Sequence, residues 1–287
     1  MALIPGHAIK APLGKGPFVK SFTLVLSFFA LLTSAHAKTL LISDVDDTLK
    51  LSNVLSPAGA AKYALDTESR FTGMSELFNF LRVDQPDMEF AYVSAAPAYP
   101  LGIIHRAFLA NAYFPSGEYF PREWGSTEAH KLAKVRELIN RHQPTQVILV
   151  GDNGNADAEI YAQIAKEYSG WGLQFFQFIR VAYSTESTKE KGKPILPEQV
   201  GYVTPLEIAI TLNKAQILKD GSLNWILDNI TSEILNEKVD ESGRGILTFP
   251  PYINCHQYQW RWDEYLNLHP ALSDLNTFIN GRCYLNL

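Results

Sequence analysis

Four short apolar runs along the chain have the composition of buried β-strands. They lie at residues 39–43, 89–94, 146–150 and 173–181. The first three show no regular alternation of polar and apolar residues, which is typical of strands covered on both faces. Between the runs, apolar residues recur at the three- and four-residue spacing of amphipathic helices. This alternation predicts a parallel sheet with helices packed on both of its faces.

The helical pattern appears in four segments between and after these strands and then dominates the chain from Thr204. The four segments are 74–82, 100–114, 130–142 and 156–168. Two further runs, 204–219 and 222–235, predict helices, the first with Thr204 as its cap and Pro205 at its first position. No linker rich in Gly, Pro or Ser separates this region from the α/β part. We therefore expect it to pack onto the core.

The first 37 residues differ in composition from the rest of the chain. They carry Lys10, Lys15 and Lys20 but no acid, then the apolar run FTLVLSFFALL and small residues up to Ala37. This order is typical of a secretory signal peptide, so we predict cleavage near Ala37 and a periplasmic or secreted protein. An uncleaved anchor is the alternative, but the run is shorter than the ~20 apolar residues of a spanning helix. We expect no stable transmembrane anchor.

These observations divide the chain into a signal peptide (1–37), a catalytic α/β domain (38–203) and a helical and aromatic C-terminal extension (204–287). The formal net charge of −5 and the absence of a basic cluster give no reason to expect a nucleic-acid partner. The two cysteines, Cys255 and Cys283, both lie in the extension. Export would permit a disulfide between them, and two buried free thiols are the equal alternative.

Polar groups stand at the carboxyl ends of the first three predicted strands. They are Asp44, Asp46 and Asp47 after the first strand, Ser94 at the end of the second, and Asp152 with Asp157 after the third. Those strand ends share one edge of a parallel sheet, where open α/β folds bind ligands, so we expect these groups to converge. Asp44 and Asp46 can face the same way, and two such close carboxylates repel unless a cation neutralises them. Carboxylate oxygens suit Mg²⁺.

The motifs DVDDT, VS, a later lysine and GDNGNAD resemble, in this order, the four motifs of the haloacid dehalogenase (HAD) superfamily of phosphatases. More narrowly, residues 40–183 are similar to the catalytic domain of the actin-patch phosphatidate phosphatases, distant relatives of the lipins. The blocks FPSGEYF and ILVGDNGNADAEIY carry most of this similarity. The resemblance implies a HAD-like Rossmannoid fold of three α/β/α layers with a parallel central sheet. We expect a small or absent cap and a helical C-terminal extension.

The resemblance also implies catalysis through an aspartyl-phosphate. Asp44 would be the nucleophile, and Asp46 would protonate the leaving oxygen and then deprotonate the attacking water. Ser94 and Lys131 would hold phosphoryl oxygens. Lys134, one helical turn further on, is the alternative to Lys131.

A Mg²⁺ cofactor follows from the same resemblance. Its implied ligands are Asp44, the main-chain carbonyl of Asp46, and Asp152. Asp157 would support the metal site, or alternatively cap the helix that follows it. Thr48 is expected to tie the turn after the first strand, and we include Thr48 and Ala95 with Ser94 and Lys131 among the predicted substrate-binding residues.

Other polar residues receive structural interpretations. Asp47 is expected to stabilise a turn rather than to bind a ligand. Five histidines show no metal-ligand spacing, and we expect them at the surface or at helix ends. They are His105, His130, His142, His256 and His269.

The sequence therefore predicts a hydrolase, a Mg²⁺-dependent phosphomonoesterase whose partner is a phosphorylated substrate. Because the relatives dephosphorylate phosphatidate, a phospholipid is one candidate substrate. Export sets this chain apart from its eukaryotic relatives, which work inside the cell, and an exported acid phosphatase or nucleotidase is an alternative. A catalytically inactive HAD-fold binding protein is the non-enzyme alternative.

Overall fold

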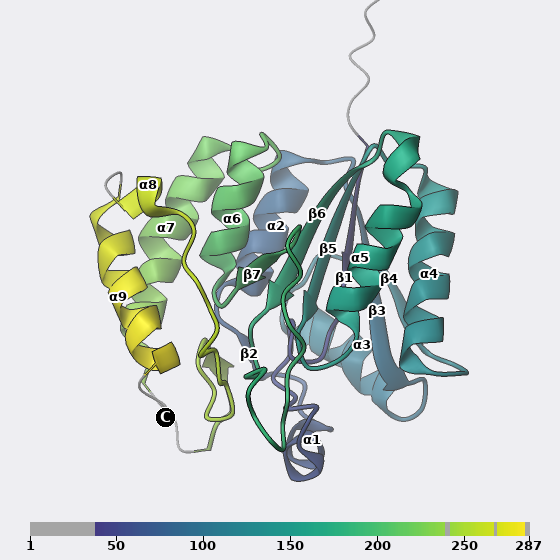
Figure 1. The fold of residues 1–287 in the computed structure, drawn as a ribbon, viewed down its shortest axis with the longest axis horizontal. Coiled ribbons are helices and arrows are strands. Elements are labelled where there is room, and N and C mark those ends of the chain that lie inside the picture. Colours follow the sequence, from purple (N-terminus) through teal and green to yellow (C-terminus); the bar gives the residue numbers. More distant parts are fainter. Residues whose placement is uncertain (1–37, 239–241, 267–268, 285–287) are drawn as a thin grey trace, which may run out of the picture. The chain divides into compact units, whose positions relative to one another are not determined.

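A six-stranded sheet forms the centre of the computed structural model, which describes residues 38–238, 242–266 and 269–284 (Figure 1). The strand order is β4-β3-β1-β5-β6-β7, and every neighbouring pair is parallel. The strands are β1 (Thr39–Ser43), β3 (Glu89–Pro97), β4 (Glu118–Arg122), β5 (Gln146–Asp152), β6 (Gln174–Arg180) and β7 (Val200–Tyr202). A separate small sheet pairs β2 (Arg70–Phe71) with β8 (Ile246–Leu247). The predicted signal peptide lies outside the described residues.

Helices cover both faces of the large sheet. They are α1 (Pro57–Tyr63), α2 (Met74–Asp84), α3 (Leu101–Asn111), α4 (Thr127–His142), α5 (Asp157–Glu167), α6 (Pro205–Lys214), α7 (Asp220–Leu235), α8 (Asp263–Leu266) and α9 (Pro270–Tyr284), with a 3-10 turn η1 (Ser169–Trp171) after α5. Helices α4 and α5 pack on one face, and α2, α3 and α6 pack on the other (Figure 1). Helix α7 packs against α2 and α6, and α9 packs against α7.

Strand β1 shows why the apolar runs lack alternation. Leu41 contributes to the apolar core on the α2 face, while Leu40 and Ile42 contribute to the core on the α4 and α5 face. Both faces of the strand are therefore buried, which is why its three central side chains are all apolar. The predicted α/β fold with a parallel central sheet and C-terminal helices is confirmed.

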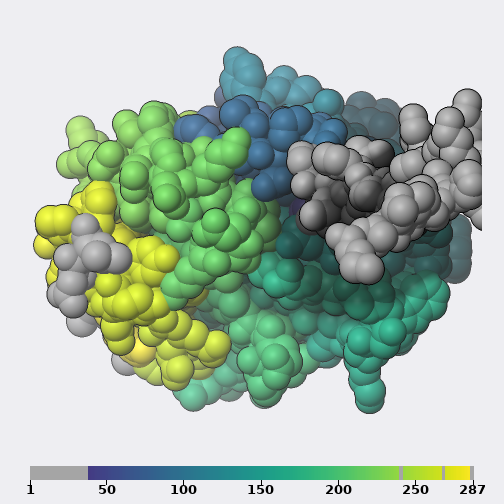
Figure 2. All heavy atoms as spheres, turned by 90° about the horizontal axis from the view of Figure 1, so that it is seen from above, coloured from purple at the N-terminus to yellow at the C-terminus, as the bar shows by residue number. Residues whose placement is uncertain are grey.

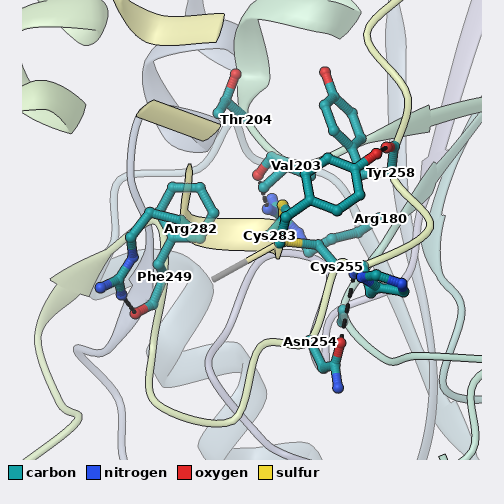
Figure 3. The surroundings of a disulfide bond; sticks show 12 residues. Arg180, Val203, Thr204, Phe249, Asn254, Cys255, Tyr258, Arg282 and Cys283 are labelled. Carbon is teal, nitrogen blue, oxygen red and sulfur yellow. Dashed lines mark hydrogen bonds between the residues drawn. A yellow bond between two sulfur atoms is a disulfide. The ribbon is translucent and has the colours of Figure 1, made fainter. Parts of the chain in front are cut away.

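The C-terminal extension packs on the sheet domain. Helix α6 begins with a capping box in which Thr204 and Glu207 satisfy each other's main-chain groups, and Pro205 occupies its first position. Figure 2 shows the last part of the extension, in yellow, beside its first part, which contains α6 and α7, in green. Of the two alternatives for the cysteines, the structure contains the disulfide: Cys255 and Cys283 are joined, which ties the segment before α8 to α9 (Figure 3). Within the described residues, no helix combines the length and apolar character needed to cross a bilayer.

Candidate active site

Three buried aspartates meet at the carboxyl edge of the sheet. Asp44 follows β1, Asp152 ends β5 and Asp157 begins α5. One carboxylate oxygen from each lies within 4.8 Å of the others, and each side chain is at most 2% exposed. The Asp44 amide donates to the Val150 carbonyl at 2.8 Å, which continues the β1–β5 pairing to the end of the strands. Of the groups that were expected to converge, Asp44, Asp152 and Asp157 do so, and we call these three residues the acid cluster.

Lys131 reaches the acid cluster from α4. Its Nζ lies 2.9 Å from Asp44 Oδ1 and 2.5 Å from Asp157 Oδ1, and the residue is 1% exposed. Lys134, one turn later, instead pairs at the surface with Glu137 at 2.8 Å. Lys131, and not Lys134, therefore lies against the acid cluster, and its contact with a phosphoryl group stays a prediction.

The acid cluster carries more acid than its lysine can balance. Burial raises the pKa of Asp44 to about 7, against the attraction of Lys131 and with added repulsion from Asp157. Burial also raises the pKa of Asp152 well above its ordinary value, and repulsion from Asp157 and Asp44 adds to this effect. Burial alone would lower the pKa of Lys131, but Asp157 and Asp44 outweigh it and raise that pKa. Three carboxyl groups therefore share one ammonium.

The Asp152 side chain has an unused acceptor inside this cluster. Its Oδ1 accepts a hydrogen bond from the Gly154 amide at 2.6 Å. Its Oδ2 is buried and has no hydrogen-bond partner among the residues that the structure describes. A buried carboxylate oxygen without a donor is costly, and surplus acid makes it more so. A hard divalent cation such as Mg²⁺ would bind the unpartnered oxygen and neutralise the surplus negative charge. The donor set of Asp44, Asp152 and Asp157 therefore fits such an ion.

The Asp157 side chain points toward Lys131 and Asp152 and does not cap its own helix. The N-cap residue of α5 is Ala156, which makes no side-chain cap bond. Asp157 Oδ1 pairs with Lys131, and its Oδ2 accepts a 3.3 Å hydrogen bond from the Asp152 amide. A Cβ at Gly151 would lie 2.6 Å from Asp157 Oδ2, so the glycine leaves room for this carboxyl. The cap alternative is wrong.

The Asp46 side chain lies apart from the acid cluster. Its Oδ1 accepts from Ser52 Oγ at 2.6 Å and lies 3.2 Å from His105 Nε2. Its Oδ2 lies 3.5 Å from Ser94 Oγ. Burial would raise the pKa of Asp46, but the contact with His105 outweighs it, so the pKa is held well below its ordinary range. The metal contact predicted for Asp46 uses its main-chain carbonyl and stays a prediction.

Two histidines contradict the prediction that all five lie at the surface or at helix ends. His105 is 2% exposed, and its Nδ1 lies 3.0 Å from the Tyr119 hydroxyl while Nε2 faces Asp46. His130 is also 2% exposed, with its ring near the Phe120 carbonyl. The helical spacing contained a signal for His105, because Phe108 and Leu109 follow at i+3 and i+4 and are buried on the same side of α3.

The other predicted site residues lie around Asp44 and Asp46. Thr48 Oγ1 donates to Asp44 Oδ2 at 3.4 Å, as expected for a residue that ties this turn. Ser94 Oγ accepts from the Ala96 amide at 3.0 Å, so its position is fixed by its own strand end. Ala95 lines the same cavity as Asp44 and Asp46.

A cavity of about 260 Å³ lies beside Asp44 and Asp46. Part of the lining comes from the segment between β1 and β2: Val54, the α1 residues Ala60 and Tyr63, and Ala64 directly after α1. Another part comes from Ala95, Ala96 and Leu101. Lys50 Nζ donates to the Tyr63 carbonyl at 2.6 Å and so fastens the end of α1 to the loop after β1. This seven-residue helix contributes to the cavity wall, and the small or absent cap stays a prediction.

Comparison with known proteins places the acid cluster within a recognised domain. Residues 39–179 match the family described as phosphatidate phosphatase APP1, catalytic domain. Over 140 residues the chain is 26% identical to phosphatidate phosphatase APP1 of Saccharomyces cerevisiae (strain ATCC 204508 / S288c), an alignment that covers 45% of this chain and 24% of the yeast protein. These findings confirm the resemblance predicted from the sequence. The matched segment contains all eight predicted site residues and ends before Arg180.

Proposed function

We propose that this protein is a Mg²⁺-dependent phosphatase that hydrolyses phosphoric monoesters through a phosphoryl group carried briefly on Asp44. The observation that carries the proposal is the acid cluster, in which Asp44 contacts the Lys131 ammonium and Asp152 Oδ2 has no partner among the described residues. A buried group of this kind is suited to a cation and an anionic substrate together. The match to a phosphatidate phosphatase catalytic domain supports the same chemistry.

The first half of the reaction is displacement at phosphorus. Asp44 forms a bond from a carboxylate oxygen to phosphorus while the bond to the leaving oxygen breaks. Lys131, 2.9 Å from Asp44, favours the ionised nucleophile and offers its remaining hydrogen to a phosphoryl oxygen. The Ser94 hydroxyl would hold a second phosphoryl oxygen. Mg²⁺ held by Asp44 and Asp152, with Asp157 supporting them, would neutralise charge on the phosphoryl oxygens.

Proton transfer falls to Asp46. His105 lowers the pKa of Asp46, so in the substrate-free protein the carboxyl is an anion, the form that can take a proton from the water that hydrolyses phospho-Asp44. In the first half, Asp46 must give a proton to the leaving oxygen. A phosphate dianion arriving beside Asp46 raises the pKa of this carboxyl, because like charges disfavour the ionised form. Asp46 then takes up a proton from solvent and passes it to the leaving oxygen.

A lipid phosphate is the substrate class that the cavity walls support best. Beyond the acidic end, the walls formed by Val54, Ala60, Ala64 and Leu101 are apolar. The basic side chains of the lining are already engaged, since Lys50 donates to main-chain carbonyls and His105 contacts Asp46. An apolar group attached to the phosphate fits such walls better than a strongly hydrated one does.

The test uses protein that starts at Lys38, assayed with a generic aryl phosphate with and without Mg²⁺. We expect metal-dependent turnover that falls by on the order of 10⁴-fold in Asp44→Asn. Turnover that is unaffected by this substitution would overturn the nucleophile assignment. A second assay compares phosphatidate in mixed micelles with a nucleoside monophosphate. A higher kcat/KM for phosphatidate supports the lipid substrate, and the reverse order supports the small-molecule phosphatase.

We also propose that the protein is exported. The basic leader, apolar run and small residues before Lys38 support this, and so does the Cys255–Cys283 disulfide, because such bonds persist in oxidising compartments. Mass spectrometry of the N-terminus of protein extracted from its source organism tests it. A chain beginning at Lys38 is expected, and a chain that retains Met1 would contradict cleavage.

A further inference from the structure

Asp47 follows directly after Asp46, and its surroundings are unusual for a turn residue. It is fully buried and has a left-handed backbone, with φ of 55°. Three main-chain amides donate to its carboxylate: Ser52 at 3.0 Å, Asn53 at 2.8 Å and Val54 at 2.8 Å. Asp47 thus stabilises the turn as the sequence predicts, and it does so by holding the segment 52–54.

Two tyrosine hydroxyls complete the shell around Asp47. Tyr183 donates to Oδ2 at 2.5 Å, and Tyr252 donates to Oδ1 at 2.7 Å. Their rings lie 6.2 Å apart in a stacked arrangement. Both residues lie outside the segment that matches the catalytic domain family, and Tyr252 belongs to the C-terminal extension. Part of the support for the loop after β1 therefore comes from residues that are far away in the sequence.

The segment that Asp47 holds belongs to the candidate active site. Ser52 and Val54 line the cavity, and Ser52 Oγ donates to Asp46 at 2.6 Å. The Tyr252 and Tyr63 rings also pack edge to face with their centroids 6.0 Å apart, and Tyr63, at the end of α1, lines the cavity. A displacement of Tyr252 would therefore disturb Asp46 through Asp47 and Ser52, and the cavity wall through Tyr63.

We propose that Tyr183 and Tyr252 are positioning residues of the active site, which fix the wall at 52–54 and the Asp46 carboxyl through Asp47. The C-terminal extension then completes the catalytic loop and is more than an appendage. This inference rests on the proposed function of the same cavity. Neither tyrosine needs to touch the substrate, because each acts through the Asp47 carboxylate, and Tyr252 also accepts from the Ser52 amide.

The extension holds Tyr252 in place with local contacts of its own. The Asn254 amide donates to the Ala182 carbonyl at 2.9 Å, so the chain around Tyr252 lies against the chain around Tyr183. The next residue, Cys255, is tied to α9 by the disulfide (Figure 3). These contacts bring the two tyrosines together although they are far apart in sequence.

The test measures kcat and KM for an aryl phosphate on full-length variants Tyr183→Phe and Tyr252→Phe. Phenylalanine keeps the ring contacts and removes the donor to Asp47. In Tyr252→Phe it also removes the hydroxyl that accepts from the Ser52 amide at 3.3 Å. We expect kcat/KM to fall about tenfold in each variant, the size of one hydrogen bond to a charged group. Tyr258→Phe is the matched control, because Tyr258 is buried in the same segment but faces Glu207. It should leave kcat/KM unchanged.

A double-mutant cycle with Asp47→Asn separates positioning from general structural support. The cycle uses Tyr183, whose hydroxyl donates to Asp47: if this tyrosine acts through Asp47, Tyr183→Phe causes no further loss of kcat/KM in the Asp47→Asn background. A full tenfold loss in that background would overturn the proposal, as would single variants that match wild type. Equal losses in Tyr252→Phe and Tyr258→Phe would overturn it as well.

Hydrogen exchange of the amides at 52–54 tests the same contacts without any substrate. Faster exchange at these amides in Tyr252→Phe than in Tyr258→Phe supports the proposal, and equal exchange contradicts it. If wild-type protein hydrolyses no phosphate ester, the proposed function fails, and the exchange result still decides whether the tyrosines position the wall.

Discussion

Asp47 and Asp152 are both fully buried at the carboxyl edge of the sheet, and they differ in what surrounds their oxygens. Asp47 receives five hydrogen bonds, three from amides and two from tyrosines. Asp152 receives one at Oδ1, has no partner for Oδ2 within the described chain, and lies beside two other acids. The first carboxylate is complete in the protein alone, whereas the second keeps an acceptor unused, as the proposed cation site requires. Under the proposed function, the comparison separates an acid that supports the fold from one that binds a ligand.

After Asp44→Asn, the largest effect should come from removing Lys131, whose ammonium contacts the acid cluster. Lys131→Met leaves Asp44 and Asp157 without their partner and removes a phosphoryl contact, so we expect kcat to fall by on the order of 10²- to 10³-fold. Lys134→Met, on the next turn, is the control and should stay within about twofold of wild type. Equal losses in the two variants would show that the position of Lys131 in the cluster does not matter for catalysis.

The two acids should respond to substitution with opposite signs in metal-free protein. Asp47→Ala leaves five buried donors without their acceptor, so we expect a loss of about 3 kcal/mol in the free energy of unfolding. Asp152→Asn keeps an acceptor for the Gly154 amide and removes a repelling charge, so stability should be unchanged or higher. Urea unfolding in the presence of a chelator measures both. Destabilisation of equal size by both substitutions would contradict the distinction.

A smaller effect concerns pH. In the metal-free fold the pKa of Asp44 is raised to about 7, above its value in the unfolded chain. Between these two pKa values the folded state binds more protons than the unfolded state, so stability should rise as pH falls from about 7 toward 5. Thermal unfolding in a chelator should show this rise in wild type and a weaker rise in Asp44→Asn. A Tm that falls equally in both proteins as the pH is lowered would contradict it.

The sequence was most informative where the geometry of a parallel sheet applies. Because strand ends share one edge, Asp44, Ser94 and Asp152 could be brought together without knowledge of any contact. Lys131 followed from the family resemblance and from its place in the helix before β5. The short edge strands β4 and β7 were missed, since Pro121 and Gly201 within them weaken the strand pattern.

The missed contacts are those that join distant parts of the chain. Tyr252 and Asp47 are 205 positions apart, and no local pattern links a tyrosine in an irregular segment to a turn near the other end. The pairing of His105 with Asp46 spans two elements, and only its burial was visible in the helical spacing. Helix α9 was also missed, because few apolar residues mark its buried side.

The most direct test of the account is a Mg²⁺ titration followed by thermal unfolding, on wild type and Asp152→Asn, with Tyr258→Phe as the control. We predict that the Tm of wild type and of Tyr258→Phe rises with Mg²⁺ and saturates, as it does when a ligand binds only the folded state. Asp152→Asn should show little or no rise. Equal, saturable stabilisation of Asp152→Asn and wild type would contradict the claim that the acid cluster binds the cation.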